Sequence, residues 1–111
     1  MRLGRLGAWA LVHELKAIDC VALAARLERW GYDTLWIPEA FGRDPVASSS
    51  WLLAHTSKLR VATGVLNIYA RDPLAALNMQ YGLAELSGGR LLLGLGVSHA
   101  PIVEGLRGHS Y

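Results

Sequence analysis

The chain has 111 residues, of which 52% are apolar and 18% are charged, and its formal net charge is +2. These values are typical of one globular domain and exclude a disordered chain. The Lys and Arg residues are scattered, which argues against nucleic-acid binding. No apolar run approaches the ~20 residues of a membrane span. The single cysteine, Cys20, cannot form an internal disulfide. We therefore expect a cytoplasmic protein with no nucleic-acid or membrane partner.

The first elements predicted along the chain are a strand, a helix and a second strand. Leu6–Val12 is an apolar run of strand length, and Ala17–Trp30 has the spacing of an amphipathic helix. Gly31 is expected to end that helix in the left-handed conformation. Thr34–Pro38 is continuously apolar, which is typical of a strand covered on both faces, and Pro38 should end it because proline cannot donate to a ladder.

An Arg-Asp-Pro motif occurs twice, at Arg43–Pro45 and again 28 residues later at Arg71–Pro73. In each copy the aspartate can cap free N–H groups and the proline can occupy the first helical position. The motifs predict helices from Pro45 to about His55 and from Pro73 to Leu86. A strand followed by a capped helix about every 30 residues predicts stacked βα units with a parallel sheet.

The remaining predicted strands both contain glycine. Leu59–Leu66 is interrupted by Gly64, and Leu91–Val97 is the fourth strand. An interior glycine marks a bulge or a place where a ligand approaches the backbone closely. No decisive periodicity follows from Ser98 to Tyr111. Four strands alternating with three helices predict an α/β fold, either as a small open sheet or as part of a (β/α)₈ barrel, which needs roughly 200 residues.

Glu39 is the only carboxylate directly at the carboxyl end of a predicted strand. Such a group can serve in acid–base chemistry, or it can accept backbone N–H bonds from the next loop, and both interpretations stay open. Gly94-Leu95-Gly96 begins like a dinucleotide fingerprint, but His99 stands where the third glycine should be. Ser98-His99 lacks the sequence of a nucleophile elbow. The histidines have no metal-ligand spacing, so no metal site is expected.

Three segments carry a resemblance to a known family. These are Gly31–Glu39, Ala62–Pro73 and Ala84–Gly96, and the Glu-Leu-Ser-Gly-Gly-Arg stretch before the last glycine-rich strand is the most specific part. The chain resembles the bacterial luciferase-like monooxygenase superfamily, and most closely its branch of oxidoreductases that use the deazaflavin coenzyme F420. The resemblance extends over nearly the whole chain but covers only the first half of the family's barrel.

The resemblance implies a fold and a set of site residues. The fold would be the N-terminal half of a luciferase-like (β/α)₈ TIM barrel, with residues 1–111 forming about four βα units of a longer protein. The Gly64-Val65 pair would form a bulge with a non-prolyl cis peptide that supports the cofactor ring. Six residues would bind the cofactor, namely Gly64, Val65, Asn67, Gly96, Val97 and Ser98. Many members have Asp-His where this chain has Glu39-Ala40, so Glu39 and His99 are the catalytic candidates for proton handling.

The resemblance also implies a function. We expect coenzyme F420-dependent hydride transfer to or from a small organic substrate. The alternatives are an FMN-dependent monooxygenase that uses molecular oxygen, and a non-catalytic half-barrel or assembly module. In the family the second and third helices pack against their copies in a homodimer. The expected partner surface here contains Trp51, Leu52, Leu77 and Tyr81.

Overall fold

The structure is a computed structural model that describes residues 2–111. The main sheet has four parallel strands in the order β1 (Gly7–Trp9), β2 (Thr34–Ile37), β3 (Arg60–Thr63) and β5 (Leu91–Leu92). A second, two-stranded parallel sheet pairs β4 (Leu66–Asn67) with β6 (Leu95–Gly96). The helices are α1 (Ala17–Arg29), α2 (Pro45–Ala54) and α3 (Pro73–Ser87), together with a 3₁₀ turn η1 (Val12–Glu14) and a π-helical segment η2 (Pro101–Leu106).

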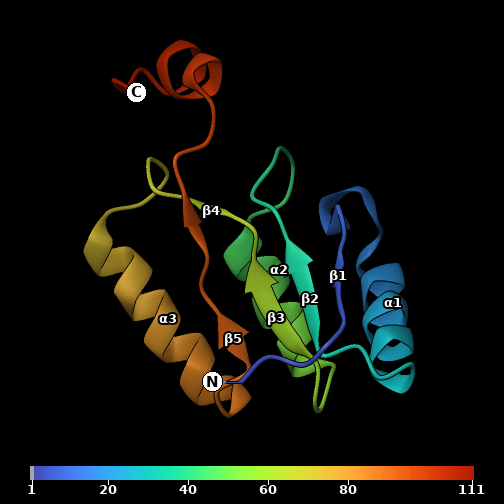
Figure 1. The fold of residues 1–111 in the computed structure, drawn as a ribbon. Coiled ribbons are helices and arrows are strands. Elements are labelled where there is room, and N and C mark those ends of the chain that lie inside the picture. The colour runs from blue at the N-terminus through green and yellow to red at the C-terminus, as the bar shows by residue number, and fades with distance from the viewer. Residues whose placement is uncertain (1) are drawn as a thin grey trace.

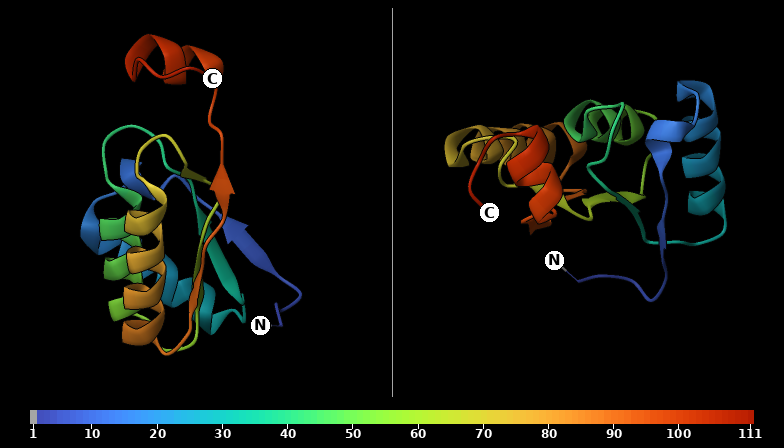
Figure 2. Two further views of the ribbon diagram at one scale, coloured as in Figure 1. Left: turned by 90° about the vertical axis from the view of Figure 1, so that its left-hand side faces the viewer. Right: turned by 90° about the horizontal axis from the view of Figure 1, so that it is seen from above.

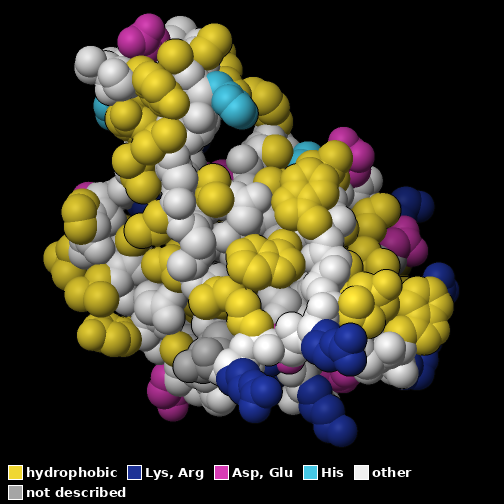
Figure 3. All heavy atoms as spheres, viewed as in Figure 1, with side chains coloured by type: hydrophobic (Ala, Val, Ile, Leu, Met, Phe, Trp, Pro, Cys, Tyr) yellow, Lys and Arg dark blue, Asp and Glu magenta, His cyan; other side chains and the backbone are white. Residues whose placement is uncertain are grey.

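The three α-helices cover one face of the main sheet, as the ribbon and its rotated views show (Figure 1, Figure 2). The opposite face is uncovered, and apolar side chains lie across its middle in the space-filling view (Figure 3). The π-helical segment η2 stands beyond the carboxyl ends of the strands (Figure 1). Parallel strands, alternating helices and a single covered face are the arrangement of consecutive βα units in a barrel wall, which confirms the predicted α/β class.

The predicted helix starts are confirmed, because they follow from local chemistry, and the predicted ends lie within one residue of the observed ones. The Asp44 carboxylate accepts from the N–H groups of Val46 (2.8 Å) and Ala47 (3.0 Å), and the next residue begins α2. The Asp72 carboxylate likewise accepts from the Ala75 N–H (2.8 Å) at the start of α3. Gly31, after α1, has φ of 79°, a left-handed conformation that costs glycine little.

Two strands differ from the prediction. The first covers only Gly7–Trp9 of the expected Leu6–Val12, because the chain turns into η1, where Val12 enters the core. The fourth, expected as one strand, is divided into β5 and β6 at Gly94. A side chain at Gly94 would overlap the Thr63 carbonyl oxygen. At this break the Thr63 hydroxyl donates to the Gly94 carbonyl and accepts from the Gly94 N–H, both at 2.9 Å.

The third strand is interrupted at Gly64, as predicted. The peptide bond between Gly64 and Val65 is cis, and the chain leaves the main sheet here and continues as β4. The expected backbone irregularity of this segment is therefore confirmed.

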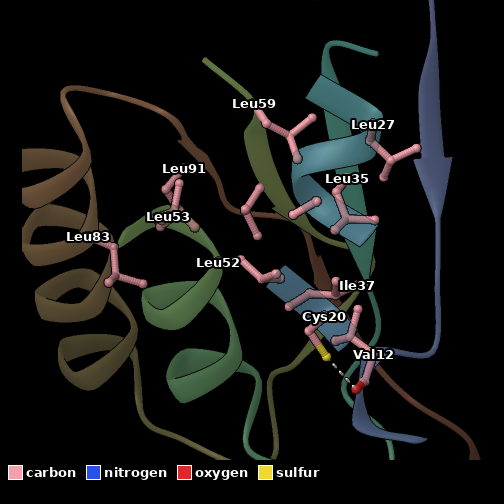
Figure 4. Close-up of a cluster of buried hydrophobic side chains, with 12 residues drawn as sticks. Val12, Cys20, Leu27, Leu35, Ile37, Leu52, Leu53, Leu59, Leu83 and Leu91 are labelled. Carbon is pink, nitrogen blue, oxygen red and sulfur yellow. Dashed lines mark hydrogen bonds between the residues drawn. The ribbon is translucent and has the colours of Figure 1, made fainter. Parts of the chain in front are cut away.

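The hydrophobic core lies between the main sheet and the helices (Figure 4). Leu35, Ile37 and Val61 of the sheet are fully buried, and Cys20 is buried with them, its thiol 3.3 Å from the Val12 carbonyl oxygen. Leu52 belongs to this cluster and is only 1% exposed. Its prediction as part of a partner surface is therefore wrong, since α2 turns this side chain toward the sheet.

Charged side chains stabilise the amino ends of the strands, at the opposite end of the sheet from the carboxyl-end loops. The Glu28 carboxylate accepts from the N–H groups of Ser57, Lys58 and Leu59 in the turn before β3, with the shortest bonds at 2.6 Å. Burial raises the pKa of Glu28, but these three N–H donors and the charge of Arg90 outweigh burial and hold that pKa below its ordinary value.

Asp33 is a second such group at the amino ends. It accepts from the Thr34 hydroxyl at 2.7 Å and is paired with Arg60. A bond from the Gly4 backbone, the Thr34 hydroxyl and the Arg60 charge together lower the pKa of Asp33. Both carboxylates therefore stabilise the fold in their ionised form.

Within residues 2–111, no helix has the length and apolarity that crossing a membrane requires. The same residues contain no group of three or more His, Cys, Asp or Glu side chains that could hold a metal ion.

Candidate functional site

A cavity of about 370 Å³ lies at the carboxyl ends of the strands. It brings together six of the eight residues predicted for the site, namely Glu39, Gly64, Val65, Asn67, Ser98 and His99. The other lining residues are Trp9, Leu11, Pro38, Ala40, Phe41 and Ile102. The segments that follow β1, β2, β3 and β6 all contribute to it, together with Asn67 of β4, as expected when parallel strands end at one edge of a sheet.

The backbone of Gly64 and Val65 forms part of the cavity wall and is held by three hydrogen bonds. The Gly64 N–H donates to the Ile37 carbonyl at 2.8 Å, and the Val65 carbonyl accepts from the Glu39 N–H at 3.1 Å. The Trp9 indole N–H donates to the Gly64 carbonyl at 3.3 Å, although the two residues are 55 positions apart. Val65 is 44% exposed and lines the cavity, where it presents an apolar side chain.

The Glu39 side chain is almost enclosed, with 10% of its surface exposed. One carboxylate oxygen, Oε2, accepts from the Asn67 N–H at 2.7 Å and from Arg71 Nη1 at 2.9 Å. Arg71 Nη2 lies 3.4 Å from the other oxygen and 3.4 Å from Oδ2 of Asp44. Of the two interpretations of Glu39, these contacts favour the acceptor of backbone N–H bonds from the next loop.

Asn67 is fixed by its own turn, and Ser98 has an unusual backbone conformation. Asn67 is 6% exposed, and its Oδ1 accepts from the Tyr69 N–H at 2.9 Å, which is an Asx-turn. Ser98 has φ of 62°, a left-handed conformation uncommon for a residue with a side chain. His99 is exposed, and within residues 2–111 its ring makes no hydrogen bond, so it is free to meet a ligand.

Gly96 and Val97 do not line the cavity. Gly96 lies directly behind Val65, because a side chain on Gly96 would overlap that of Val65. Its carbonyl also accepts from the Ile68 N–H at 3.0 Å. Gly96 therefore supports the cavity wall from behind Val65. The side chain of Val97 is half-exposed and lies outside the cavity.

Besides the lining residues Leu11, Pro38 and Ala40, four residues that shape the site were not among the predicted catalytic and cofactor-binding residues. Trp9 and Phe41 are large aromatic walls, 57% and 68% exposed, and their positions after strands were the available signal. Ile102 comes from η2, a segment without decisive periodicity in the sequence. Arg71 belongs to the repeated Arg-Asp-Pro motif, in which the sequence explains the aspartate and the proline as a helix start but assigns no role to the arginine.

The cavity is suited to a ligand with apolar faces and a few polar groups. Its walls at Trp9, Phe41, Val65 and Ile102 are apolar, and the charge of Glu39 is balanced by Arg71. Polar groups that can meet a ligand come from Asn67, Ser98 and His99. Apolar walls with a few placed polar groups are typical of small-molecule and cofactor pockets.

Comparison with known proteins gives one family. The family described as luciferase-like monooxygenase matches residues 3–111. A protein of Mycobacterium tuberculosis named "Putative coenzyme F420-dependent oxidoreductase Rv3520c" is 38% identical over 112 residues, covering 100% of this chain and 31% of the relative. The chain thus spans about a third of the length of that relative.

Solved structures share the fold. The coenzyme F420-dependent tetrahydromethanopterin reductase of Methanopyrus kandleri superposes with a TM-score of 0.84 and 22% identity, covering 96% of this chain and 30% of the reductase. The oxygenating constituent of 3,6-diketocamphane monooxygenase of Pseudomonas putida, solved with FMN, gives 0.80 and 16% identity, with coverage of 94% and 32%. These likenesses place the four βα units in the luciferase-like TIM-barrel fold.

Proposed function

The chain belongs to the luciferase-like monooxygenase family, and we propose that it forms part of an oxidoreductase that uses coenzyme F420. Its reaction would be hydride transfer to or from a small organic substrate. When bound, the coenzyme supplies a carbon centre on its deazaflavin ring that accepts or donates the hydride. The protein supplies position and a pocket from which water is excluded.

The observation that carries the proposal is the cavity at the carboxyl ends of the strands, where six residues expected from the family resemblance meet. The residues fit a tricyclic ring with polar edges, since apolar groups form the walls and neutral donors lie between them. The 38% identity with a relative named for coenzyme F420 supports this cofactor over FMN.

The residues of this chain would act by holding and orienting. Val65 would support one face of the ring, with Gly96 behind it, and Trp9 would fix the backbone of the supporting segment. His99 is the candidate for moving a proton to or from the substrate, because its ring has no partner among residues 2–111. Glu39 would hold the next loop through the Asn67 N–H, and proton handling by Glu39 stays a prediction.

Equilibrium titration tests the proposal. The full-length protein that contains residues 1–111 would be titrated with oxidised coenzyme F420 and, in parallel, with FMN, following the fluorescence of each. Tighter binding of coenzyme F420, followed by its reduction with a panel of alcohols or other hydride donors, supports the proposal. Tighter binding of FMN with oxygen consumption would favour the monooxygenase. Binding of neither would favour the non-catalytic assembly module, whose edge strands would be β1 and β5.

We also propose a homodimer through α2 and α3. Trp51 is 43% exposed on α2, and Leu77 and Tyr81 are 45% and 67% exposed on α3, which packs beside α2. Large apolar groups on neighbouring helices are suited to a self-complementary interface. Light scattering on the full-length protein would show a dimer, and Tyr81→Asp would shift it toward the monomer. A monodisperse monomer before substitution would contradict the proposal.

A further inference from the structure

The arginine of each Arg-Asp-Pro motif reaches back to the loop of the preceding βα unit. Arg43 Nη2 donates to the Leu15 carbonyl at 2.8 Å, and its Nη1 donates to the Val12 carbonyl at 3.2 Å. The motif therefore has two parts. The aspartate and proline begin their own helix, and the arginine fastens that unit to the one before it.

Arg71, the arginine of the second motif, meets side chains rather than carbonyls. Its side chain is 13% exposed, and its guanidinium lies between the carboxylates of Glu39 (2.9 Å) and Asp44 (3.4 Å). Both carboxylates belong to the connection between β2 and α2, which contributes Glu39 to the cavity. A planar guanidinium with several fixed donors suits such a bridge better than an ammonium group.

Glu39 connects Arg71 to Asn67 through a shared carboxylate oxygen. Oε2 of Glu39 accepts from Arg71 and, at 2.7 Å, from the Asn67 backbone N–H. The side chain of Asn67 is then committed by its Asx-turn, in which Oδ1 accepts from the Tyr69 N–H at 2.9 Å. This bond uses the oxygen end of the carboxamide. Within residues 2–111 the Nδ2 group has no hydrogen-bond acceptor, so the donor end is what Asn67 can offer in the cavity.

We propose that Arg71 is a positioning residue that acts through Glu39 to hold Asn67, and that the Asn67 amide nitrogen donates a hydrogen bond to a ring carbonyl oxygen of the bound cofactor. The inference rests on the proposed function, because it takes the occupant of the cavity to be a deazaflavin or flavin. Both ring systems carry carbonyl oxygens on one edge, which are acceptors only. An amide nitrogen matches them, whereas a carboxylate would repel them.

Substitution of Asn67 tests the direction of this hydrogen bond. Asn67→Asp keeps an oxygen to accept from the Tyr69 N–H but replaces the donor with an acceptor. The dissociation constant of oxidised coenzyme F420, measured by fluorescence on the full-length protein, should rise about 10- to 100-fold, more than loss of one neutral hydrogen bond alone. Asn78→Asp, on the exposed side of α3, adds the same charge and is the matched control, with no more than about a twofold change expected.

Substitution of Arg71 tests the positioning role. Arg71→Met leaves Glu39 enclosed without its cation and should raise the same dissociation constant by roughly 10-fold. In the double variant Glu39→Gln with Arg71→Met, the side-chain carbonyl of the new amide can still accept from the Asn67 N–H. No enclosed charge is left unpaired, because the carboxylate of Asp44, the other partner of Arg71, is half-exposed. The double variant should therefore recover most of the affinity. A residue in direct contact with the cofactor would give no such recovery.

The outcomes separate the two proposals. If the unaltered protein binds neither coenzyme F420 nor FMN, the proposed function fails and this inference fails with it. If the unaltered protein binds and Asn67→Asp binds equally well, the inference alone is overturned. It is also overturned if the double variant binds no better than Arg71→Met. Should Arg71→Met fail to fold, the double variant is compared with the unaltered protein, and a dissociation constant raised about 10-fold or more in the double variant overturns the positioning role.

Discussion

Glu28 provides a test of how the turn before β3 is stabilised. Its carboxylate, on α1, accepts from three consecutive backbone N–H groups at Ser57, Lys58 and Leu59, across about 30 residues of sequence. Glu28→Gln keeps the shape of the side chain but removes its charge. The new NH₂ group replaces one carboxylate oxygen and, as a donor, cannot accept from the backbone N–H groups. The substitution should therefore weaken all three bonds at once.

The expected cost follows from these bonds. A hydrogen bond to a charged group contributes about 1.5–3 kcal/mol, but the turn lies at the surface, where water replaces part of the loss. We expect Glu28→Gln to lower the free energy of unfolding of the full-length protein by about 2–3 kcal/mol near neutral pH. Glu14→Gln, exposed in η1, should change it by less than about 0.5 kcal/mol.

The pH dependence gives the sharper result. The pKa of Glu28 is lower in the folded protein than its ordinary value of 4.5, so folding favours the ionised carboxylate. Its contribution is present above the unfolded-state pKa and is lost as the pH falls through the folded-state pKa. Urea unfolding between pH 7 and about pH 3 should show the difference between Glu28→Gln and the parent shrinking with acid. A difference that stays constant over this range would refute the reasoning.

Three further predictions concern the site and the assembly. Thr63→Val removes the hydroxyl that bridges the N–H and carbonyl of Gly94 and should destabilise the protein by about 1–3 kcal/mol in urea unfolding, whereas no loss would show that the bridge contributes nothing. Gly96→Ala should displace the Val65 side chain and weaken cofactor binding at least ~10-fold, as measured by fluorescence titration. Unchanged affinity would show that Val65 does not contact the cofactor. Residues 1–111 alone leave β1 and β5 as unpaired edges, so light scattering should show oligomers or aggregates rather than a stable monomer.

The parts of the fold that were predictable depend on neighbouring residues. Asp44 and Asp72 cap their helices through bonds two or three positions away, so the sequence alone indicates where each helix begins. Gly64 could be chosen because it interrupts an otherwise apolar strand and stands at a position matched by the family resemblance. Six of the eight site residues that the family resemblance implied meet in one cavity, because parallel strands present their carboxyl ends together.

The parts that were missed depend on contacts distant in sequence. The break at Gly94 exists because Thr63, 31 residues earlier, approaches its backbone. Arg71 pairs with Glu39 across 32 residues, and nothing in the Arg-Asp-Pro motif itself indicates the direction of the arginine. Leu52 was assigned to the surface because α2 is apolar on most sides, so its periodicity does not distinguish the face toward the sheet.

A crystal structure of the full-length protein with oxidised coenzyme F420 tests the central claim most directly. The account predicts the deazaflavin ring at the carboxyl ends of the strands, with one face against Val65 and a ring carbonyl oxygen within about 3.2 Å of Asn67 Nδ2. A ring bound elsewhere, or a cavity that stays empty at saturating coenzyme while the protein remains folded, would contradict it.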